Sequence, residues 1–399
     1  MYRSRGSQFS FSKGSRFAPK KQFHGGRYSS RSGVNDISKY IKAAEAQRPA
    51  DVMETDVFYK DMDIMDRIKK AVIARGYEKP TPIQVQAIPH IQKGRDVIGI
   101  ANTGTGKTGA FLIPLLEKIL NDDSQKVLIV APTRELSQQI KEELRLLTHD
   151  MRIYSALVIG GTSMQPQIQQ VRRNPHIVIG TPGRLIDLIE RRILNLSNFQ
   201  NVVLDEVDRM VDMGFIKDVR YLISMLPKVR QSLFFSATVS PQINSIIQTF
   251  LTDPITVSVR TRETSKNVEQ NVVKVAVGSN KMKTLEELLE KEELKKVLIF
   301  GRTKRGVERL SSNLYAKGFK VASIHGDKPQ NKRDMAIRLF KNNSVDILVA
   351  TDVAARGLDI PDVTHVINFD EPATYDDYIH RIGRTGRGDK RGHALTFVD

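Results

Sequence analysis

The stretch that decides the fold is Asp96-Val-Ile-Gly-Ile-Ala-Asn-Thr-Gly-Thr-Gly-Lys-Thr108. It begins as a short apolar run, continues as a glycine-rich segment that ends in lysine and threonine, and leads into a helical pattern. A glycine-rich segment between a strand and a helix is the setting of a phosphate-binding loop. Gly104 and Gly106 let backbone N–H groups approach phosphates, because glycine has no side chain in the way. Lys107 supplies positive charge, and the Thr108 hydroxyl is suited to Mg²⁺.

This loop misses the general pattern by one residue, since Ala101 stands where the pattern has glycine. Alanine is also small, so we still expect the segment to bind a nucleotide. The residues expected to contact it are Ala101, Asn102, Thr103, Gly104, Thr105, Gly106, Lys107 and Thr108.

A second apolar run, Val202-Val-Leu204, is followed by two carboxylates, Asp205 and Glu206. Alone, an acidic pair after a strand is usually a helix cap or surface charge. Downstream of a phosphate-binding loop it predicts a catalytic centre, in which Asp205 holds Mg²⁺ and Glu206 is the general base toward an attacking water. The two segments together indicate a nucleoside triphosphatase.

Short apolar runs alternate with helical segments along most of the chain, which predicts parallel sheets covered on both faces. The pattern starts near residue 56, is interrupted by a polar stretch and then resumes. We therefore expect a disordered tail, a first α/β domain, a linker and a second α/β domain over residues 1–50, 56–252, 253–268 and 269–399. Such sheets bind ligands at the carboxyl ends of their strands, where the two segments described above lie.

The composition excludes several classes of protein. The 399 residues contain no cysteine, which excludes disulfides and thiolate zinc sites and fits a cytoplasmic protein. No apolar run approaches the ~20 residues that a membrane span needs. The formal net charge is +17, and residues 1–35 hold eight Lys/Arg residues, six aromatic residues and no Asp or Glu. This tail either binds single-stranded nucleic acid through phosphate contacts and base stacking, or only keeps the chain in solution.

Further motifs identify a family. The chain contains, in order, Gly76-Tyr-Glu-Lys-Pro-Thr-Pro-Ile-Gln84, Asp205-Glu-Val-Asp208, Ser236-Ala-Thr238 and His380-Arg-Ile-Gly-Arg-Thr-Gly-Arg387. Together they resemble the DEAD-box RNA helicases of the second helicase superfamily, over roughly residues 56–399. The resemblance implies two tandem RecA-like domains joined by a flexible linker, with ATP and Mg²⁺ as cofactors and RNA as the partner.

The resemblance also implies how the nucleotide is held. Gln84 would contact the adenine edge and an aromatic ring its face. Tyr59 is this ring where phenylalanine is more usual, and the neighbouring Phe58 is the alternative. The other interpretation of an aromatic residue at this position is a core residue. Arg384 and Arg387 would reach the γ-phosphate from the second domain, Arg387 as the arginine finger, so hydrolysis would depend on domain closure. Further nucleotide contacts are expected from Lys79 and Asp359, and the expected catalytic residues are Glu206, Lys107, Arg384 and Arg387.

The same resemblance implies a groove for RNA and a device that couples it to the nucleotide. The groove residues follow strands or begin helices, and they are Pro132, Thr133, Arg134, Gly160, Gly161, Thr181, Pro182, Gly183, Arg184, Arg302, Thr303, Gln330, Arg333 and Thr351. The coupling residues are Asp208, Ser236, Thr238 and His380. Val207 stands where the family has alanine, and its two additional methyl groups bear on the strength of the coupling, not on the chemistry.

The leading function is therefore RNA-stimulated ATP hydrolysis by a monomer, with local, non-processive strand separation and ribonucleoprotein remodelling. The alternative is an ATP-gated RNA clamp or chaperone that unwinds little. A DNA-translocating relative would lack the region around Gln84 and carry large insertions between motifs, and this chain shows neither. The sequence stops at Asp399, soon after the arginine motif, where family members usually continue; this leaves open a trimmed second domain or an incomplete chain.

Overall fold

The computed structural model describes residue 40 and residues 56–102, 104–259, 267–275, 280–291, 294–355, 360–386 and 390–398. Three residues with expected nucleotide contacts, Thr103, Asp359 and Arg387, lie outside the described residues, as do almost all of the predicted tail and part of the predicted linker. None of the helices that are described is long and apolar enough to cross a membrane.

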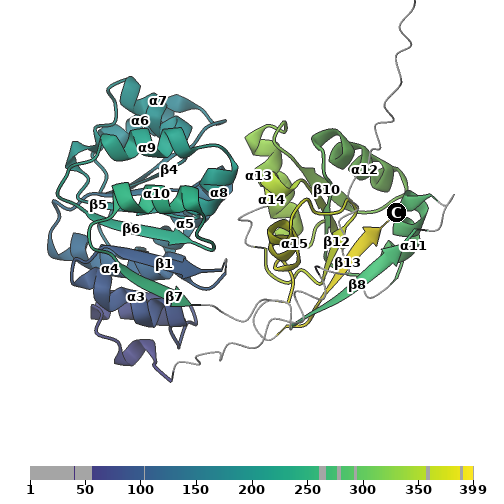
Figure 1. The fold of residues 1–399 in the computed structure, drawn as a ribbon, viewed down its shortest axis with the longest axis horizontal. Coiled ribbons are helices and arrows are strands. Elements are labelled where there is room, and N and C mark those ends of the chain that lie inside the picture. Colours follow the sequence, from purple (N-terminus) through teal and green to yellow (C-terminus); the bar gives the residue numbers. More distant parts are fainter. Residues whose placement is uncertain are drawn as a thin grey trace, which may run out of the picture. The chain divides into compact units, whose positions relative to one another are not determined.

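The first domain is built on a seven-stranded sheet in the order β3-β4-β2-β5-β6-β1-β7, and every pairing in it is parallel (Figure 1). The central strands consist mostly of buried Val, Leu, Ile and Phe, as expected for a parallel sheet covered on both faces. The strands are β1 (Val97–Ala101), β2 (Val127–Val130), β3 (Ser155–Val158), β4 (Ile177–Gly180), β5 (Asn201–Leu204), β6 (Gln231–Ser236) and β7 (Ile255–Val259).

Helices cover both faces of this sheet. In β2, Val127 and Ile129 join one apolar cluster while Leu128 and Val130 join the other, because successive strand residues point to opposite faces. The first cluster includes residues of α2 (Asp66–Ile73), α3 (Pro82–Gln92), α4 (Lys107–Asn121) and α5 (Arg134–Leu147). The second includes residues of α6 (Met164–Arg172), α7 (Pro182–Glu190), α8 (Val207–Asp212), α9 (Ile216–Ser224) and α10 (Pro241–Phe250). Two short 3₁₀ helices, η1 (Tyr59–Asp61) and η2 (Leu196–Asn198), complete the domain.

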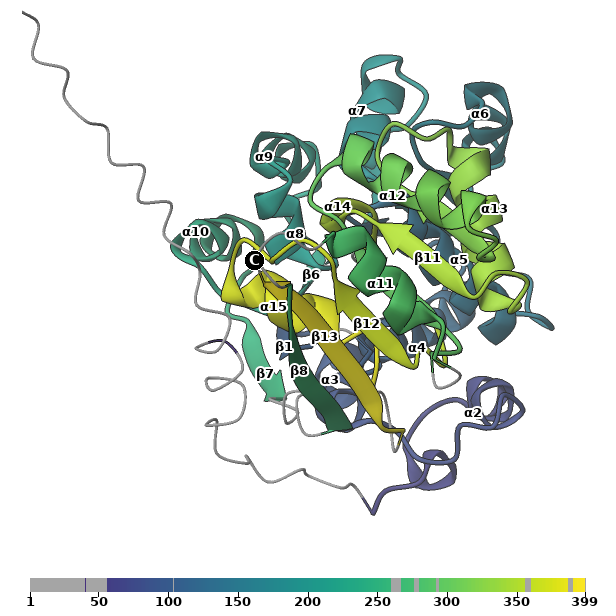
Figure 2. The same cartoon turned by 90° about the vertical axis from the view of Figure 1, so that its right-hand side faces the viewer.

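The second domain has a six-stranded sheet in the order β10-β11-β9-β12-β13-β8, also parallel throughout. Its strands are β8 (Val268–Lys274), β9 (Val297–Phe300), β10 (Val321–Ile324), β11 (Ile347–Ala350), β12 (His365–Asn368) and β13 (Gly392–Val398). Figure 2 shows β12, β13 and β8 side by side. One face packs against α11 (Lys281–Leu289) and α12 (Lys304–Ala316), and the other against α13 (Gln330–Lys341) and α14 (Asp352–Ala355). The helix α15 (Tyr375–Ile382) packs near β8 and β13 through Tyr378 and Ile382.

These two sheets confirm the predicted fold of two parallel α/β domains. The predicted linker, residues 253–268, needs a correction, because it contains β7, which pairs with β1 along its whole length. In β7 only Val257 and Val259 are buried, while Thr256 and Ser258 are exposed. An edge strand with one polar face therefore reads as a polar linker in the sequence. Within the predicted tail, Tyr40 packs its ring against Tyr375, with centroids 5.7 Å apart.

Candidate nucleotide and RNA site

The strand order divides the carboxyl edge of the first sheet into two parts. The phosphate loop and the acidic pair follow β1 and β5, and Ser236 is the last residue of β6. These three strands are neighbours in the sheet. The segments beginning at Pro132, Gly160 and Thr181 follow β2, β3 and β4, which form the other half. The predicted nucleotide residues and the predicted RNA residues thus lie at adjacent stretches of one sheet edge, as ligand sites of parallel sheets do.

The phosphate loop runs from the end of β1 into α4. Gly104 and Gly106 have φ values of +81° and +88°, in the left-handed region that favours glycine. A side chain at position 106 would also press on Thr81, whose Oγ1 would lie 2.6 Å from the added Cβ. Lys107 is buried, and its ammonium donates to the Ala101 carbonyl oxygen at 2.9 Å. The loop therefore places the lysine at the start of α4, where an anion is favoured.

The acidic pair is buried at the end of β5, where Asp205 and Glu206 are 2% and 4% exposed. Burial, together with the negative charges of Glu206 and Asp208, raises the pKa of Asp205 to about 7, although Lys107 opposes the shift. An oxygen ligand in such a place is stabilised by a nearby cation, since a cation removes the cost of the buried charge. Asp205 and the Thr108 hydroxyl are hard oxygen donors of the kind that Mg²⁺ prefers, so the residues present fit this ion.

Glu206 has a different environment. It lies at the N-cap of α8 with φ +51°, and its carboxylate forms a buried ion pair with Nη1 of Arg209. Burial disfavours its charge, but Arg209, Lys107 and Arg384 together hold the pKa of Glu206 below its usual range. Glu206 is therefore ionised at neutral pH, as a general base must be.

The predicted coupling residues of the first domain form one hydrogen-bond network. The Asp208 carboxylate accepts from the backbone N–H groups of Ala237 at 3.0 Å and Thr238 at 3.2 Å. The Ser236 hydroxyl accepts from the Asp208 N–H at 3.3 Å and donates to the Thr238 carbonyl oxygen at 2.8 Å. This network joins the segment after β5 to the segment after β6. Val207 lies between Glu206 and Asp208 in the sequence. It is fully buried in the second apolar cluster of the domain, which includes residues of α8.

The first turn of α3 places Gln84 beside the phosphate loop. The Gln84 side-chain Nε2 donates to the Gly106 carbonyl oxygen at 3.0 Å, and its Oε1 accepts from the Tyr59 hydroxyl at 2.6 Å. Tyr59 itself is only 3% exposed. Phe58 is half-buried, and the ammonium group of Lys79 lies over its ring, 5.1 Å from the ring centroid. The structure thus brings Tyr59, Gln84 and the loop together and places Lys79 at the neighbouring Phe58.

The RNA half of the edge is lined by arginine and glycine. Arg134 begins α5 after the cap residue Thr133, and its guanidinium lies against Gly160 and Gly161, where a side chain would collide with it. Burial and the neighbouring Arg333 lower the pKa of Arg134, which indicates crowded positive charge. Thr181 is the cap residue of α7 and Pro182 begins the helix, while Gly183 has open space where a side chain would stand. Such concentrated positive charge beside small residues suits a phosphate backbone.

Hydrogen bonds and an ion pair join α5 to predicted groove residues of α13. Arg134 Nη1 donates to Gln330 Oε1 at 3.1 Å, and Gln330 Nε2 donates to Glu135 Oε1 at the same distance. Arg333 forms an ion pair with Glu135 at 2.6 Å. Glu135 was not among the predicted groove residues, although it lies next to Arg134 in the sequence.

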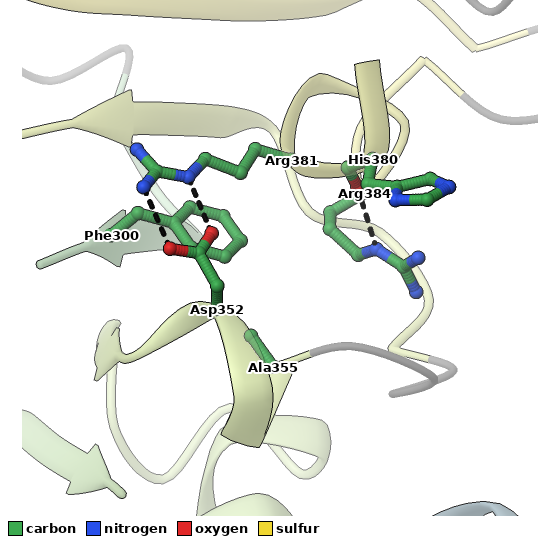
Figure 3. Close-up of a pocket in the computed structure, with 6 residues that line it drawn as sticks. All are labelled: Phe300, Asp352, Ala355, His380, Arg381 and Arg384. Atoms are coloured by element: carbon green, nitrogen blue, oxygen red, sulfur yellow. Dashed lines mark hydrogen bonds and ion pairs between the residues drawn. The ribbon is translucent and has the colours of Figure 1, made fainter. Parts of the chain in front are cut away.

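In the second domain, predicted residues again follow strands. Arg302 follows β9 and is exposed, with its backbone N–H bonded to the Asp370 carboxylate at 2.7 Å, and Thr303 caps α12. Thr351 follows β11 and is buried. His380 and Arg384 lie at the end of α15, where Arg384 Nε donates to the His380 carbonyl oxygen at 3.1 Å (Figure 3).

Arg381, between these two residues, has a role that the sequence did not indicate. Its Nε and Nη2 donate to the two oxygens of Asp352 at 2.6 and 2.8 Å (Figure 3). Its Nη1 donates to Asn368 Oδ1 at 3.2 Å and to the Asp370 carbonyl oxygen at 2.7 Å. Arg381 therefore ties α15 to α14 and to the end of β12. A separate role for each arginine in the 380–387 motif could not be assigned from their spacing.

Comparison with known proteins agrees with this geometry. Residues 81–246 match the family model described as DEAD/DEAH box helicase, and residues 280–389 match the model of the helicase conserved C-terminal domain. The chain is 45% identical over 345 residues to the DEAD-box ATP-dependent RNA helicase CshA of Bacillus subtilis, which covers 86% of this chain and 69% of that protein. The chain belongs to the DEAD-box helicase family.

Other DEAD-box proteins are also similar to this chain in sequence and in structure. CshA of Bacillus cereus is 44% identical over 342 residues, and the match spans 85% of this chain but 65% of the relative's length. Among solved structures, the DEAD-box fold of Mss116p bound to single-stranded RNA and AMP-PNP is similar with a TM-score of 0.78 and 30% identity, covering 88% of this chain and 76% of that one. This chain therefore spans slightly less than two thirds of some relatives that it matches.

Proposed function

We propose that this chain is an ATP-dependent RNA helicase, a hydrolase that uses ATP to separate short RNA duplexes locally and to remodel ribonucleoproteins. The observation that carries the proposal is the placement of Lys107 and the buried Asp205–Glu206 pair at one sheet edge, next to an arginine- and glycine-lined stretch. The similarity to CshA and to a family member bound to RNA and a nucleotide supports the same activity.

In this proposal the phosphate loop holds the triphosphate of ATP. Lys107 releases the Ala101 carbonyl and turns to the phosphate oxygens, and the backbone N–H groups at Gly104 and Gly106 bind the same anion. Thr108 and Asp205 would hold Mg²⁺, which when bound neutralises charge on the phosphates. Glu206 accepts a proton from the attacking water, for which its carboxylate must first leave Arg209.

Hydrolysis then depends on the second domain. Arg384, and Arg387 as the arginine finger, stabilise the charge that develops on the γ-phosphate, which for such a finger is worth ~10³–10⁵ in rate. RNA held by Arg134, Arg184 and the groove residues favours the closed arrangement, and the Asp208–Ser236–Thr238 network with His380 passes the effect to the nucleotide. Val207, where the family has alanine, adjusts this coupling from within α8. The protein acts as a cytoplasmic monomer.

The decisive experiment measures ATP turnover without nucleic acid, with single-stranded RNA and with single-stranded DNA. Stimulation by RNA is expected, and its absence would show that the closure mechanism is wrong. Glu206→Gln should lower the RNA-stimulated rate by about 10²–10⁴, the usual contribution of a general base. Glu290→Gln, at an exposed position in the second domain, is the matched control and should retain the wild-type rate.

Two further measurements define the activity. Displacement of a short labelled strand from blunt and tailed duplexes distinguishes a helicase from an RNA clamp, because a clamp hydrolyses ATP without displacing the strand. Removal of residues 1–50 should weaken RNA binding and flatten its salt dependence, since these residues carry much of the positive charge. Unchanged affinity and salt dependence would assign the tail to solubility alone.

A further inference from the structure

The hydrogen bonds of Gln84 determine what its side chain can offer to a base. Gln84 is 6% exposed. Its Oε1 faces the backbone N–H of Thr81 at 2.8 Å, and its Nε2 faces the carbonyl oxygen of Gly106 at 3.0 Å. A backbone N–H only donates and a carbonyl oxygen only accepts, so these partners fix which end of the amide is oxygen.

The Tyr59 hydroxyl completes this arrangement. It lies 2.6 Å from Oε1, and because Oε1 can only accept, the phenol donates. Burial raises the pKa of Tyr59, so the phenol keeps its proton at neutral pH. The Gln84 oxygen then accepts two hydrogen bonds, which uses both of its lone pairs, while Nε2 retains one N–H beyond the bond to Gly106.

Neither partner can easily turn away. The Tyr59 ring belongs to the apolar cluster of α2 and α3, and its backbone N–H donates to the Glu78 carbonyl oxygen at 2.9 Å. On the other side, Gln84 packs so closely on α4 that a Cβ added at Gly109 would lie 2.5 Å from Nε2. The carboxamide is therefore held from both sides.

A glutamine that selects adenine needs both ends of its amide, since it accepts from the 6-amino group and donates to N7. In this chain the accepting end is occupied and only a donor is left. N7 is present in adenine, guanine and hypoxanthine alike, so this donor does not distinguish these bases. We propose that the Tyr59 hydroxyl makes Gln84 a reader of purine N7 alone, and that Tyr59 thereby relaxes selection for adenine over other purine nucleotides. This inference rests on the proposed use of ATP and names the residue that sets its base selectivity.

The test compares ADP with IDP, which carries a carbonyl oxygen in place of the 6-amino group. Each displaces a fluorescent ADP analogue from the full chain without RNA, for the wild type, Tyr59→Phe and Tyr315→Phe. Tyr315→Phe removes the same atom from a tyrosine that is 74% exposed. The wild type and Tyr315→Phe should bind ADP and IDP comparably. Tyr59→Phe should raise the preference for ADP by about threefold to tenfold, because one hydrogen bond becomes available.

Each other outcome is informative. An unchanged ADP/IDP ratio in Tyr59→Phe would overturn the inference, and so would a strong preference for ADP in the wild type. Because the readout is a ratio measured on one sample of folded protein, a small loss of stability in Tyr59→Phe does not affect it. If RNA stimulates hydrolysis but the ratio does not move, only this inference fails. If the ratio moves but RNA gives no stimulation, the proposed function fails and the assignment of Tyr59 stands.

Discussion

The two domains each contain a buried arginine paired with a carboxylate, and the two pairs differ in how completely the arginine is satisfied. Arg381 in the second domain directs three nitrogens to Asp352, Asn368 and the Asp370 carbonyl oxygen. Arg209 in the first domain reaches Glu206 through Nη1, whereas its buried Nε and Nη2 have no hydrogen-bond partner within the described part of the chain.

The difference separates an arginine that holds a fold from one that holds Glu206, the proposed general base. A fully bonded buried arginine recovers the cost of its desolvation, and moving it breaks several bonds at once. An arginine with unsatisfied donors gains less from its present position, so its partner is released at lower cost. We infer that Arg209 keeps Glu206 ionised and restrained before the reaction, while Arg381 keeps α15 in place.

The largest effect is expected when the fully bonded pair is broken. Arg381→Met should lower the free energy of unfolding by about 3–5 kcal/mol, because Asp352 loses its partner and Asn368 is left with an unsatisfied buried oxygen. Urea denaturation followed by circular dichroism measures this change. Arg338→Met, at an exposed position on α13, should cost little. Equal stabilities of the two variants would contradict the structural role of Arg381.

Breaking the loosely bonded pair should cost less and should depend on pH. Arg209→Met is expected to cost about 2–4 kcal/mol at pH 7, since a buried carboxylate loses its counter-charge. In the wild type the pKa of Glu206 is held below its ordinary value of 4.5, which stabilises the fold above that pH and is lost as the pH falls through the lowered pKa. The penalty of Arg209→Met should therefore shrink as the pH falls below 4.5. A penalty that stays constant with pH would show that Arg209 acts through packing alone.

A substitution at Asp205, the carboxylate next to Glu206, should change the free energy of unfolding in the opposite direction. Asp205→Asn should increase stability by about 1–3 kcal/mol at pH 8 without Mg²⁺, because it removes an unpaired buried charge. Burial raises the pKa of Asp205 from 3.8 to about 7, so the folded state loses stability as the pH rises between these values. The gain should vanish at pH 4, where the wild-type carboxyl is neutral. Asp63→Asn, at an exposed position, is the control, and a destabilised Asp205→Asn would refute this account.

The smallest effect is expected for a substitution at Val207, which lies in α8 together with Arg209. Val207→Ala should destabilise the first domain by about 1 kcal/mol, because two buried methyl groups are removed from a packed cluster. The ratio of RNA-stimulated to basal ATP turnover measures whether Val207 also adjusts coupling. A changed ratio would assign it that role, and an unchanged ratio would limit it to packing.

The sequence predicted those features that are local or that repeat. Glycine spacing predicted the loop at Gly104 and Gly106, and the apolar runs predicted the parallel strands, because both signals lie within a few adjacent residues. The edge strand β7 was missed, since alternate residues there face solvent.

The remaining site features depend on contacts between distant parts of the chain. Tyr59 and Gln84 are 25 residues apart, and nothing in the sequence indicates that a hydroxyl occupies the glutamine oxygen. Arg381 and Asp352 are separated by 29 residues, and their pairing is determined by how α15 packs beside α14. Arg209 follows Glu206 by three residues, so its ion pair could have been anticipated from helical spacing.

The pairing of β8 with β13 has a consequence for the order of assembly. Seven residue pairs join Gly392–Val398 to Val268–Lys274, so among the strands that the structure describes β8 pairs with β13 alone. During synthesis on the ribosome, the first domain can complete its sheet while the second is still emerging. Until residues 392–398 have left the exit tunnel, β8 has an unpaired edge that invites association with other chains. A chaperone that binds exposed strands would thus act between the emergence of β8 and that of β13.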